Sequence, residues 1–363
     1  MNKKLMEREK WIESNLLSID NNDKIKDLEI FSLYSNDIDK IPKEIGQLQN
    51  LKELYLGGHK IVKLPKEISQ LQNLEKLILR NTHLRKLPKE IGQLQNLKEL
   101  YLSGNSLVQL PKEIGQLQNL EKLILYANEI DKLPKEIGQL TNLKILDLSI
   151  NRIITLPKEI GQLQNLRIFN LTINRIITLP KEIGQLQNLK TLDLRENRIV
   201  ILPKRIGQLQ NLKELYLQDN HLVKLPKEIG QLLSLEGLDL HQNNLLKLPK
   251  KINQLLNLQG LDITNNQIVK LPNKILQLQN LKMINFNDKK IKNLEFGNFR
   301  TVEDIFNKNQ AIQSKEDNTS KDLTKKELSI VNNKELIKEE LTEEEKKNLL
   351  NEYHLFFSAF QNR

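Results

Sequence analysis

The chain has 363 residues, of which 38% are hydrophobic and 4% are aromatic, and it carries a formal net charge of +10. It contains no cysteine, which excludes disulfide caps, a thiol nucleophile, thiolate metal ligands and lipid anchors on cysteine. No apolar stretch reaches the length of a membrane-spanning helix.

The first residues include basic side chains, but they lack the apolar core and the small-residue cleavage site of a signal peptide. We therefore expect a cytoplasmic protein, with non-classical export or secretion as the alternative. Within residues 1–27, Leu5, Trp11, Leu16 and Leu17 fall near one face of a helix. This pattern predicts a helical cap over the first structural unit, because repeat arrays need ends with a polar outer face.

All eleven prolines are spaced by 23 residues, from Pro42 to Pro272. In the copy at residues 143–165, apolar and polar residues alternate around Asp147, which predicts a strand with one buried face. After Pro157 the apolar spacing lengthens to three, which predicts a short 3-10 or α-helical turn with this proline in its first position and Gly161 near its end. A single copy has too few apolar contacts to offset its ordering entropy, so the copies must stack.

The pattern LxxLxLxxNxIxxLP with the tail LPKEIGQLQNL resembles the 23-residue leucine-rich repeat of Ras-suppressor/Shoc-type proteins and of bacterial, notably spirochaete, proteins. It covers residues 28–294 as eleven full copies and a half copy. The resemblance implies an α/β solenoid, a curved horseshoe with a parallel β-sheet on its concave face and short helical or 3-10 turns on its convex face. It also implies a non-enzymatic scaffold that binds proteins, with host interaction or virulence as one role in bacteria.

Most copies carry asparagine at one position of the pattern, and a buried column of asparagines is expected to bond the backbones of adjacent turns. The exceptions are His59, Thr82 and Lys289. We expect the copies around residues 57–62 and 80–85 to be locally looser than the copy around residues 149–154.

One residue per copy lies between two strand leucines and is not dictated by stacking, so we expect it to project from the concave face. In the first half it alternates tyrosine and isoleucine, which predicts an exposed patch that anchors a protein partner. In the second half it is largely acidic, which predicts selection of a basic or polar region of that partner. An internal duplication of residues 51–96 as 97–142 would also explain the alternation. The predicted partner-binding residues are Tyr55, Ile78, Tyr101, Ile124, Tyr126, Asp147, Asn170, Asp193, Tyr216, Asp239 and Asp262.

Other chemistry has weaker support in the sequence. Lysines recur before the prolines, but interleaved glutamates and the scarcity of aromatic residues argue against a nucleic-acid partner. His241 follows Asp239, yet too few further ligands converge there for a metal site. There is no phosphate-binding GxxxxGK[ST] motif and no Ser/His/Asp grouping, so we predict no catalytic residues, no metal and no cofactor.

After the repeats, Phe296, Phe299 and Phe306 predict a C-terminal cap at residues 295–306. Residues 307–326 are polar and lack periodicity, as in a flexible linker. Residues 327–363 end in an apolar stripe at helical spacing, which predicts an amphipathic helix. This helix is expected either to fold back on the solenoid or to dock a second partner or a second copy of the chain, as in an adaptor or regulatory subunit.

Overall fold

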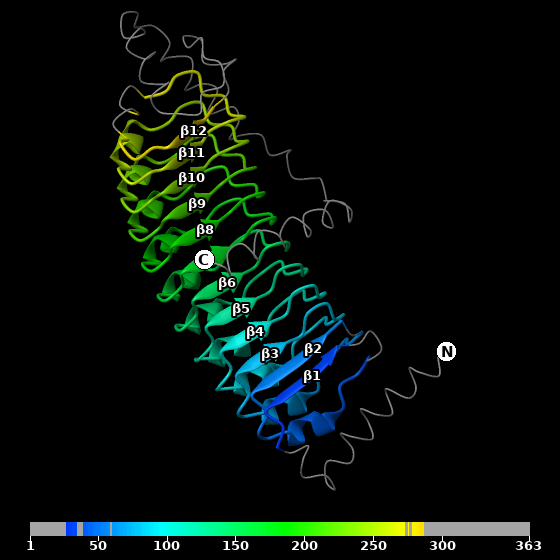
Figure 1. Ribbon diagram of the computed structural model, residues 1–363. Coiled ribbons are helices and arrows are strands. Elements are labelled where there is room, and N and C mark those ends of the chain that lie inside the picture. Colours follow the sequence, from blue (N-terminus) through cyan, green and yellow to red (C-terminus); the bar gives the residue numbers. More distant parts are fainter. Residues whose placement is uncertain (1–26, 35–38, 59, 273–274, 276–277, 287–363) are drawn as a thin grey trace, which may run out of the picture. The chain divides into compact units, whose positions relative to one another are not determined.

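The computed structural model describes residues 27–286, apart from residues 35–38, 59, 273–274 and 276–277. Within these residues, twelve strands form one parallel sheet in which each strand pairs with the next one along the chain (Figure 1). The strands are β1 Ile30–Tyr34, β2 Glu53–Gly57, β3 Lys76–Ile78, β4 Glu99–Tyr101, β5 Lys122–Ile124, β6 Ile145–Asp147, β7 Ile168–Asn170, β8 Thr191–Asp193, β9 Glu214–Tyr216, β10 Gly237–Asp239, β11 Gly260–Asp262 and β12 Met283–Asn285.

A five-residue 3-10 helix lies on the other side of each of ten repeats, away from the sheet (Figure 1). These helices are η2 Lys43–Gln47, η3 Lys66–Gln70, η4 Lys89–Gln93, η5 Lys112–Gln116, η6 Lys135–Gln139, η7 Lys158–Gln162, η8 Lys181–Gln185, η9 Lys204–Gln208, η10 Lys227–Gln231 and η11 Lys250–Gln254. The predicted α/β solenoid of stacked repeats is therefore confirmed. The predicted cap at 295–306, the linker at 307–326 and the helix at 327–363 lie outside the described residues, as does the N-terminal cap except for Asp27.

The register of the sheet follows the sequence period, since each strand residue pairs with the residue 23 positions later. Leu54 pairs with Leu77, and Tyr55 pairs with Ile78. In a strand, successive side chains point to opposite faces, so the leucines enter the core and the residues between them project from the sheet. This register turns every position of the repeat into a straight column across the sheet.

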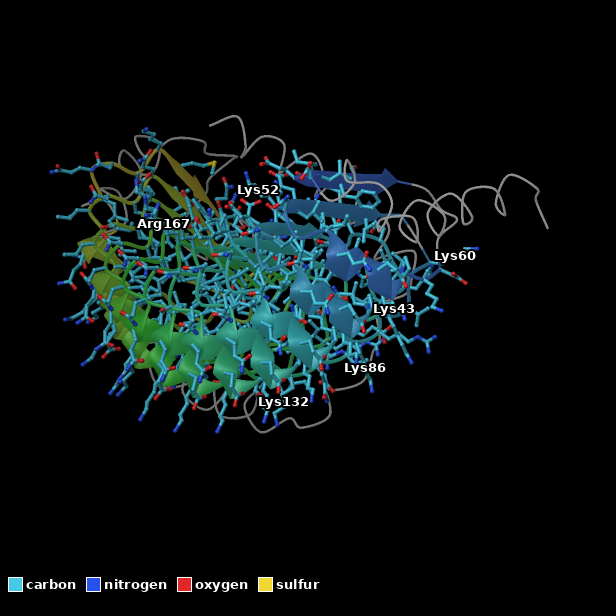
Figure 2. The ribbon with its side chains drawn as sticks, turned by 90° about the horizontal axis from the view of Figure 1, so that it is seen from below. Lys43, Lys52, Lys60, Lys86, Lys132 and Arg167 are labelled. Atoms are coloured by element: carbon cyan, nitrogen blue, oxygen red, sulfur yellow. The ribbon has the colours of Figure 1, made fainter. Side chains whose placement is uncertain are left out.

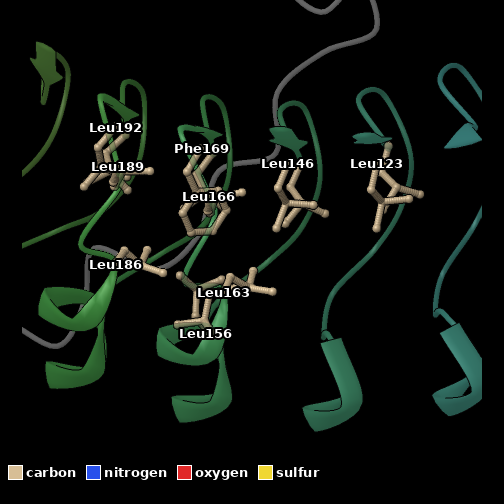
Figure 3. Packing of buried hydrophobic residues seen from close by; sticks show 14 of the residues in the cluster. Leu123, Leu146, Leu156, Leu163, Leu166, Phe169, Leu186, Leu189 and Leu192 are labelled. Atoms are coloured by element: carbon tan, nitrogen blue, oxygen red, sulfur yellow. The ribbon is translucent and has the colours of Figure 1, made fainter. Parts of the chain in front are cut away.

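The core consists of one apolar layer per repeat (Figure 3). Leu146, Phe169 and Leu192 are successive members of one strand column, and none of them is exposed to solvent. Leu163 and Leu166, between the 3-10 helix Lys158–Gln162 and the strand Ile168–Asn170, are equally buried. Because each layer is covered by the layers before and after it, burial depends on the stack and not on a single copy.

In the copy at residues 143–165, Pro157 and Gly161 act differently from the sequence prediction. Pro157 precedes its helix in an extended conformation, with φ −67° and ψ 148°, and its carbonyl accepts the first helical hydrogen bond from the Ile160 amide at 3.1 Å. Gly161 lies inside the helix. A Cβ atom on Gly161 would meet the Glu182 carbonyl oxygen and Gln185 Oε1 of the next repeat at 2.5 Å. The lack of a side chain at Gly161 therefore allows the close approach of these two turns, and Gly161 does not serve as a helix exit.

The asparagine column forms the expected ladder of buried hydrogen bonds. The side-chain Nδ2 of Asn151 donates to the carbonyl of Leu148 in its own repeat and to that of Leu125 in the preceding one, both at 3.0 Å. Its Oδ1 accepts from the Ile130 amide at 2.9 Å. Each asparagine therefore satisfies backbone groups that the turn would otherwise bury without partners. The same pattern recurs in the copies that carry Asn105, Asn128, Asn174, Asn197, Asn220, Asn243 and Asn266.

Candidate functional site

The outward face of the sheet presents three neighbouring columns of side chains. The central column contains the residues between the strand leucines. The leading column lies two residues earlier, and the flanking column lies two residues later. Strand pairing aligns the first two columns. Backbone hydrogen bonds from Gly58 to Arg80 (3.0 Å) and from Asn81 to Ser103 (2.8 Å) continue the alignment at the flanking column. Side chains of adjacent repeats are therefore neighbours across this whole face.

In the first half of the central column, tyrosines and isoleucines differ in exposure. Ile78 and Ile124 are only 9% and 8% exposed, while Tyr55 and Tyr101 are partly exposed. The expected exposed row of alternating residues is thus a row of tyrosine rings with buried isoleucines between them. The tyrosines therefore form the part of this row that a partner can reach.

Charged residues of the leading column hold these tyrosines in place. The Tyr55 hydroxyl donates to Glu53, and the Tyr101 hydroxyl donates to Glu99 at 3.0 Å. Burial, with the nearby Glu99 carboxylate, raises the pKa of Tyr101 to about 12, so the hydroxyl stays protonated and remains a donor. Fixed rings lose little conformational entropy when a partner binds, which favours their use as anchors.

Cations surround the same rings. Lys76 lies between the two tyrosines, with Nζ 5.8 Å from the Tyr55 ring centre and 5.9 Å from that of Tyr101. Glu99 neutralises Lys76 at 3.3 Å and Lys122 at 2.8 Å. Arg80, in the flanking column, stacks on Tyr101 with its guanidinium carbon 4.5 Å from the ring centre. Contacts of this kind orient a cation over an aromatic face.

In the second half of the central column, acidic and amide side chains bond the backbone two residues later. The amide of Ser149 donates to Asp147 at 2.9 Å, and those of His241 and Thr264 donate to Asp239 and Asp262 at the same distance. The amide of Thr172 donates to Asn170 at 3.0 Å, and that of Arg195 donates to Asp193 at 3.2 Å. This local side-chain-to-backbone pattern is typical of Asp and Asn where a strand ends.

These bonds reduce the acidic character expected for this half. Asp147 is 2% exposed, and burial raises the pKa of its carboxyl to about 6. Arg195 makes a bidentate ion pair with Asp193, with its Nη2 at 2.6 Å and its Nε at 2.9 Å, and lies 5.3 Å from the ring centre of Tyr216. Asp262 also accepts from Asn285 at 2.9 Å. These carboxylates thus already accept hydrogen bonds from within the solenoid, which leaves them less available to a partner.

His241 does not organise a metal site. Its Nδ1 lies 2.6 Å from the Thr264 hydroxyl. In the part of the chain that the structure describes, no group of three or more His, Cys, Asp or Glu residues could hold a metal ion. Over the same part, no helix has the length and hydropathy needed to cross a bilayer.

The recurring lysines lie away from the sheet. Figure 2 shows Lys43, Lys86 and Lys132 on the side of the 3-10 helices. Elsewhere on the surface, lysines pair with glutamates across repeats, as in Lys98 with Glu75 and Lys144 with Glu121, both at 2.8 Å. Positive and negative charges are therefore interleaved there, as on an ordinary solvated surface.

The sequence analysis did not single out Lys76, Arg80 and Ser103, which the structure brings beside the predicted tyrosines. The signal was present in the spacing: over the first five strands the flanking column contains Tyr34, Gly57, Arg80, Ser103 and Tyr126. Of these residues only the aromatic Tyr126 was predicted to bind a partner. Comparing this column between copies would have shown that it varies as much as the central column.

Family comparisons agree with this architecture. A model described as a leucine-rich repeat region matches residues 158–245, and one described as leucine rich repeat matches residues 72–130 and 118–176. Among solved structures, a leucine-rich-repeat protein of Leptospira interrogans is 38% identical, covering 75% of this chain and 86% of that chain, with a TM-score of 0.53. No curated protein matches the chain.

Receptor structures are similar too. A TDR receptor is 30% identical, covering 68% of this chain and 45% of its own, with a TM-score of 0.60. The plant peptide hormone receptor RGFR1, solved in complex with RGF2, is 28% identical, covering 73% of this chain and 48% of its own, with a TM-score of 0.57. The stacked strands and turns thus define a solenoid of the class that commonly serves as a protein-binding scaffold. The chain belongs to the leucine-rich-repeat family.

Proposed function

We propose that this chain is a non-enzymatic scaffold that binds a protein partner on the outward face of the sheet, centred on Tyr55, Tyr101 and Tyr126. The observation that carries the proposal is that the Tyr55 and Tyr101 rings are partly exposed while their hydroxyls are held by Glu53 and Glu99. Aromatic side chains that keep one conformation are typical anchors of protein interfaces. The complex of the similar plant receptor with RGF2 supports a protein or peptide as the partner class.

The central-column residues of the second half are part of the same proposed face, with a smaller role. Asp147, Asn170 and Asp193 are buried and bonded. Tyr216, Asp239 and Asp262 remain partly exposed and offer the contacts that a long partner would reach. We expect the affinity to come from the tyrosine half.

The test is a binding measurement with a partner obtained by affinity capture on the full chain. The double variant Tyr55→Ala with Tyr101→Ala should weaken binding by tenfold or more, as expected for two anchor residues. The control is Ile154→Ala with Ile177→Ala, which truncates two exposed aliphatic side chains outside the sheet. Unchanged affinity in the tyrosine variant, with its melting temperature preserved, would reject the proposed site.

The adaptor alternative concerns residues 327–363, which lie outside the described residues. Deleting them separates the readings. An adaptor would lose one captured partner and keep another, a dimer would change its size in solution, and a helix that folds back would lower the melting temperature of a monomer on deletion.

A further inference from the structure

Two residues of the flanking column, Arg80 and Ser103, lack the central-column acceptor that Ser149, Thr172, Arg195 and Thr264 have in the same column. In those four repeats the central residue is Asp or Asn, and it accepts from the flanking side chain. The hydroxyl of Ser149 donates to Asp147 at 2.6 Å, and that of Thr172 donates to Asn170 at 2.8 Å. Thr264 donates to Asp262 at 2.6 Å. In these four repeats an acceptor oxygen therefore lies beside the flanking side chain.

At Arg80 and Ser103 the central column holds Ile78 and Tyr101, and neither supplies that oxygen. Ser103 is 1% exposed, and its hydroxyl has no hydrogen-bond partner in the part of the chain that the structure describes. A buried hydroxyl without a partner is costly and marks a place where another molecule can supply one.

Arg80 lacks the carboxylate partner that Arg195 has at the equivalent position five repeats later. Arg195 is satisfied by both carboxylate oxygens of Asp193. The exposed guanidinium of Arg80 stacks on Tyr101 and has no ion-pair partner among the described residues. Its aligned neighbours in the flanking column are Gly57 and Ser103, which are both small residues.

We propose that Arg80 and Ser103 form a subsite for a side-chain carboxylate of an acidic peptide segment in the partner. The ligand carboxylate would lie over the flanking column, where it would supply the acceptor that Asp193 gives to Arg195 and Asp147 gives to Ser149. It would accept from the guanidinium in a charge-assisted hydrogen bond and from the Ser103 hydroxyl. Glu99 does not compete for Arg80, because Lys76 and Lys122 already neutralise it.

This inference rests on the proposed function, because it assigns partner chemistry to the same face, and it can be tested separately with a free carboxylate. Sodium acetate is titrated into the full-length protein at constant ionic strength, and the side-chain Nε resonances of arginines are followed by NMR. Arg80 should show a saturable shift that Ser103→Ala weakens. Arg85 is the internal control, because it is an exposed arginine of the same repeat that contacts no aromatic ring or carboxylate among the described residues. A response at Arg80 no larger than at Arg85 would overturn the subsite.

The second arm uses peptides selected from a displayed random library on the full-length protein. Peptides that bind should share an Asp or Glu at one position and lose at least tenfold in affinity with Arg80→Gln, but not with Arg85→Gln. Peptides that need Tyr55 and Tyr101 but are indifferent to Arg80→Gln would overturn the subsite and leave the proposed function intact. Saturable acetate binding at Arg80 with a captured partner indifferent to both tyrosines would support the subsite and reject the proposed binding surface.

Discussion

Asp147 shows how a residue of the outward face can serve the fold at an electrostatic cost. Its carboxylate accepts from the Ser149 amide and hydroxyl, but it is almost fully buried, and this burial raises the pKa of its carboxyl to about 6. The next repeat has Asn170 at the same position, with the same two bonds from Thr172. The hydrogen bonds therefore do not require a charge, whereas burial penalises one.

We predict that Asp147→Asn stabilises the protein at neutral pH. The folded pKa of about 6 lies above the unfolded value near 4, so the folded state binds the proton more tightly. The free energy of unfolding of the wild type then falls as the pH rises from about 4 to about 6 and stays low above that range. Removing the ionisable group should gain on the order of 2–3 kcal/mol at pH 7.5 and little at pH 4.

Melting curves of wild type and Asp147→Asn between pH 4 and pH 8 check this prediction. Asp193→Asn is the matched control, because it breaks the bidentate pair with Arg195 and should destabilise at pH 7.5. A gain for Asp147→Asn that is the same at pH 4 and pH 7.5 would contradict the electrostatic explanation.

The turn element of the third repeat departs from the asparagine ladder. Thr82 is buried, and its hydroxyl donates to Asn105 Oδ1 at 2.5 Å. Thr82 has no side-chain amide. In Asn128 this group makes two bonds: its Nδ2 donates to the Leu102 carbonyl at 3.0 Å, and its Oδ1 accepts from the backbone amide of Leu107 at 3.1 Å. By the same spacing, an asparagine at position 82 would reach Leu56 and Ile61.

We predict that Thr82→Asn stabilises this element by about 1–2 kcal/mol, the net value of one or two added hydrogen bonds. Amide exchange should then slow at residues 80–85, which we expect to exchange faster than residues 149–154 in the wild type. The reciprocal variant Asn128→Thr should destabilise its own repeat. Equal protection of the two segments in the wild type would refute the expected local looseness.

A second departure occurs in the segment that follows the 3-10 helices. Gln210 donates to the carbonyls of Gly207 at 2.8 Å and Gln231 at 3.2 Å, which ties its turn to the next one. Leu233 and Leu256 occupy this position in the following two repeats and are 53% and 58% exposed. They can make neither bond.

We predict that Leu233→Gln raises the melting temperature by about 1–2 °C, because it restores bonds to Gly230 and Gln254 that are worth a fraction of a kcal/mol each at an exposed site. The control is Gln210→Leu, which should lower the melting temperature by a similar amount. A lower melting temperature for Leu233→Gln would show that the leucine makes packing contacts that outweigh the missing bonds.

Across the whole molecule, the fold could be predicted from the sequence because every repeat places the same residue in the same layer. The period can be read from residues such as Pro157, and the core can be read from residues such as Leu146, without considering contacts between copies. The outward face could be predicted only in part. The sequence alone suggests that Asp193 is an acidic contact, whereas the structure pairs it with Arg195. The sequence alone suggests that Arg80 is a solvated charge, whereas the structure stacks it on Tyr101, with Ile78 offering no acceptor. These roles depend on pairs of columns, which a single column cannot reveal.

The stack also predicts how the molecule should fail when it is cut. Leu146, Phe169 and Leu192 belong to three successive layers, and each layer is buried by its neighbours. A lone repeat would therefore expose both faces of its layer. We expect a synthetic peptide of residues 143–165 to be unfolded in dilute buffer, with no cooperative thermal transition by circular dichroism, while the full chain melts cooperatively. An isolated repeat that shows a cooperative transition at micromolar concentration, with sedimentation as a monomer, would mean that its own contacts offset the entropy of ordering it and that stacking is not the source of stability.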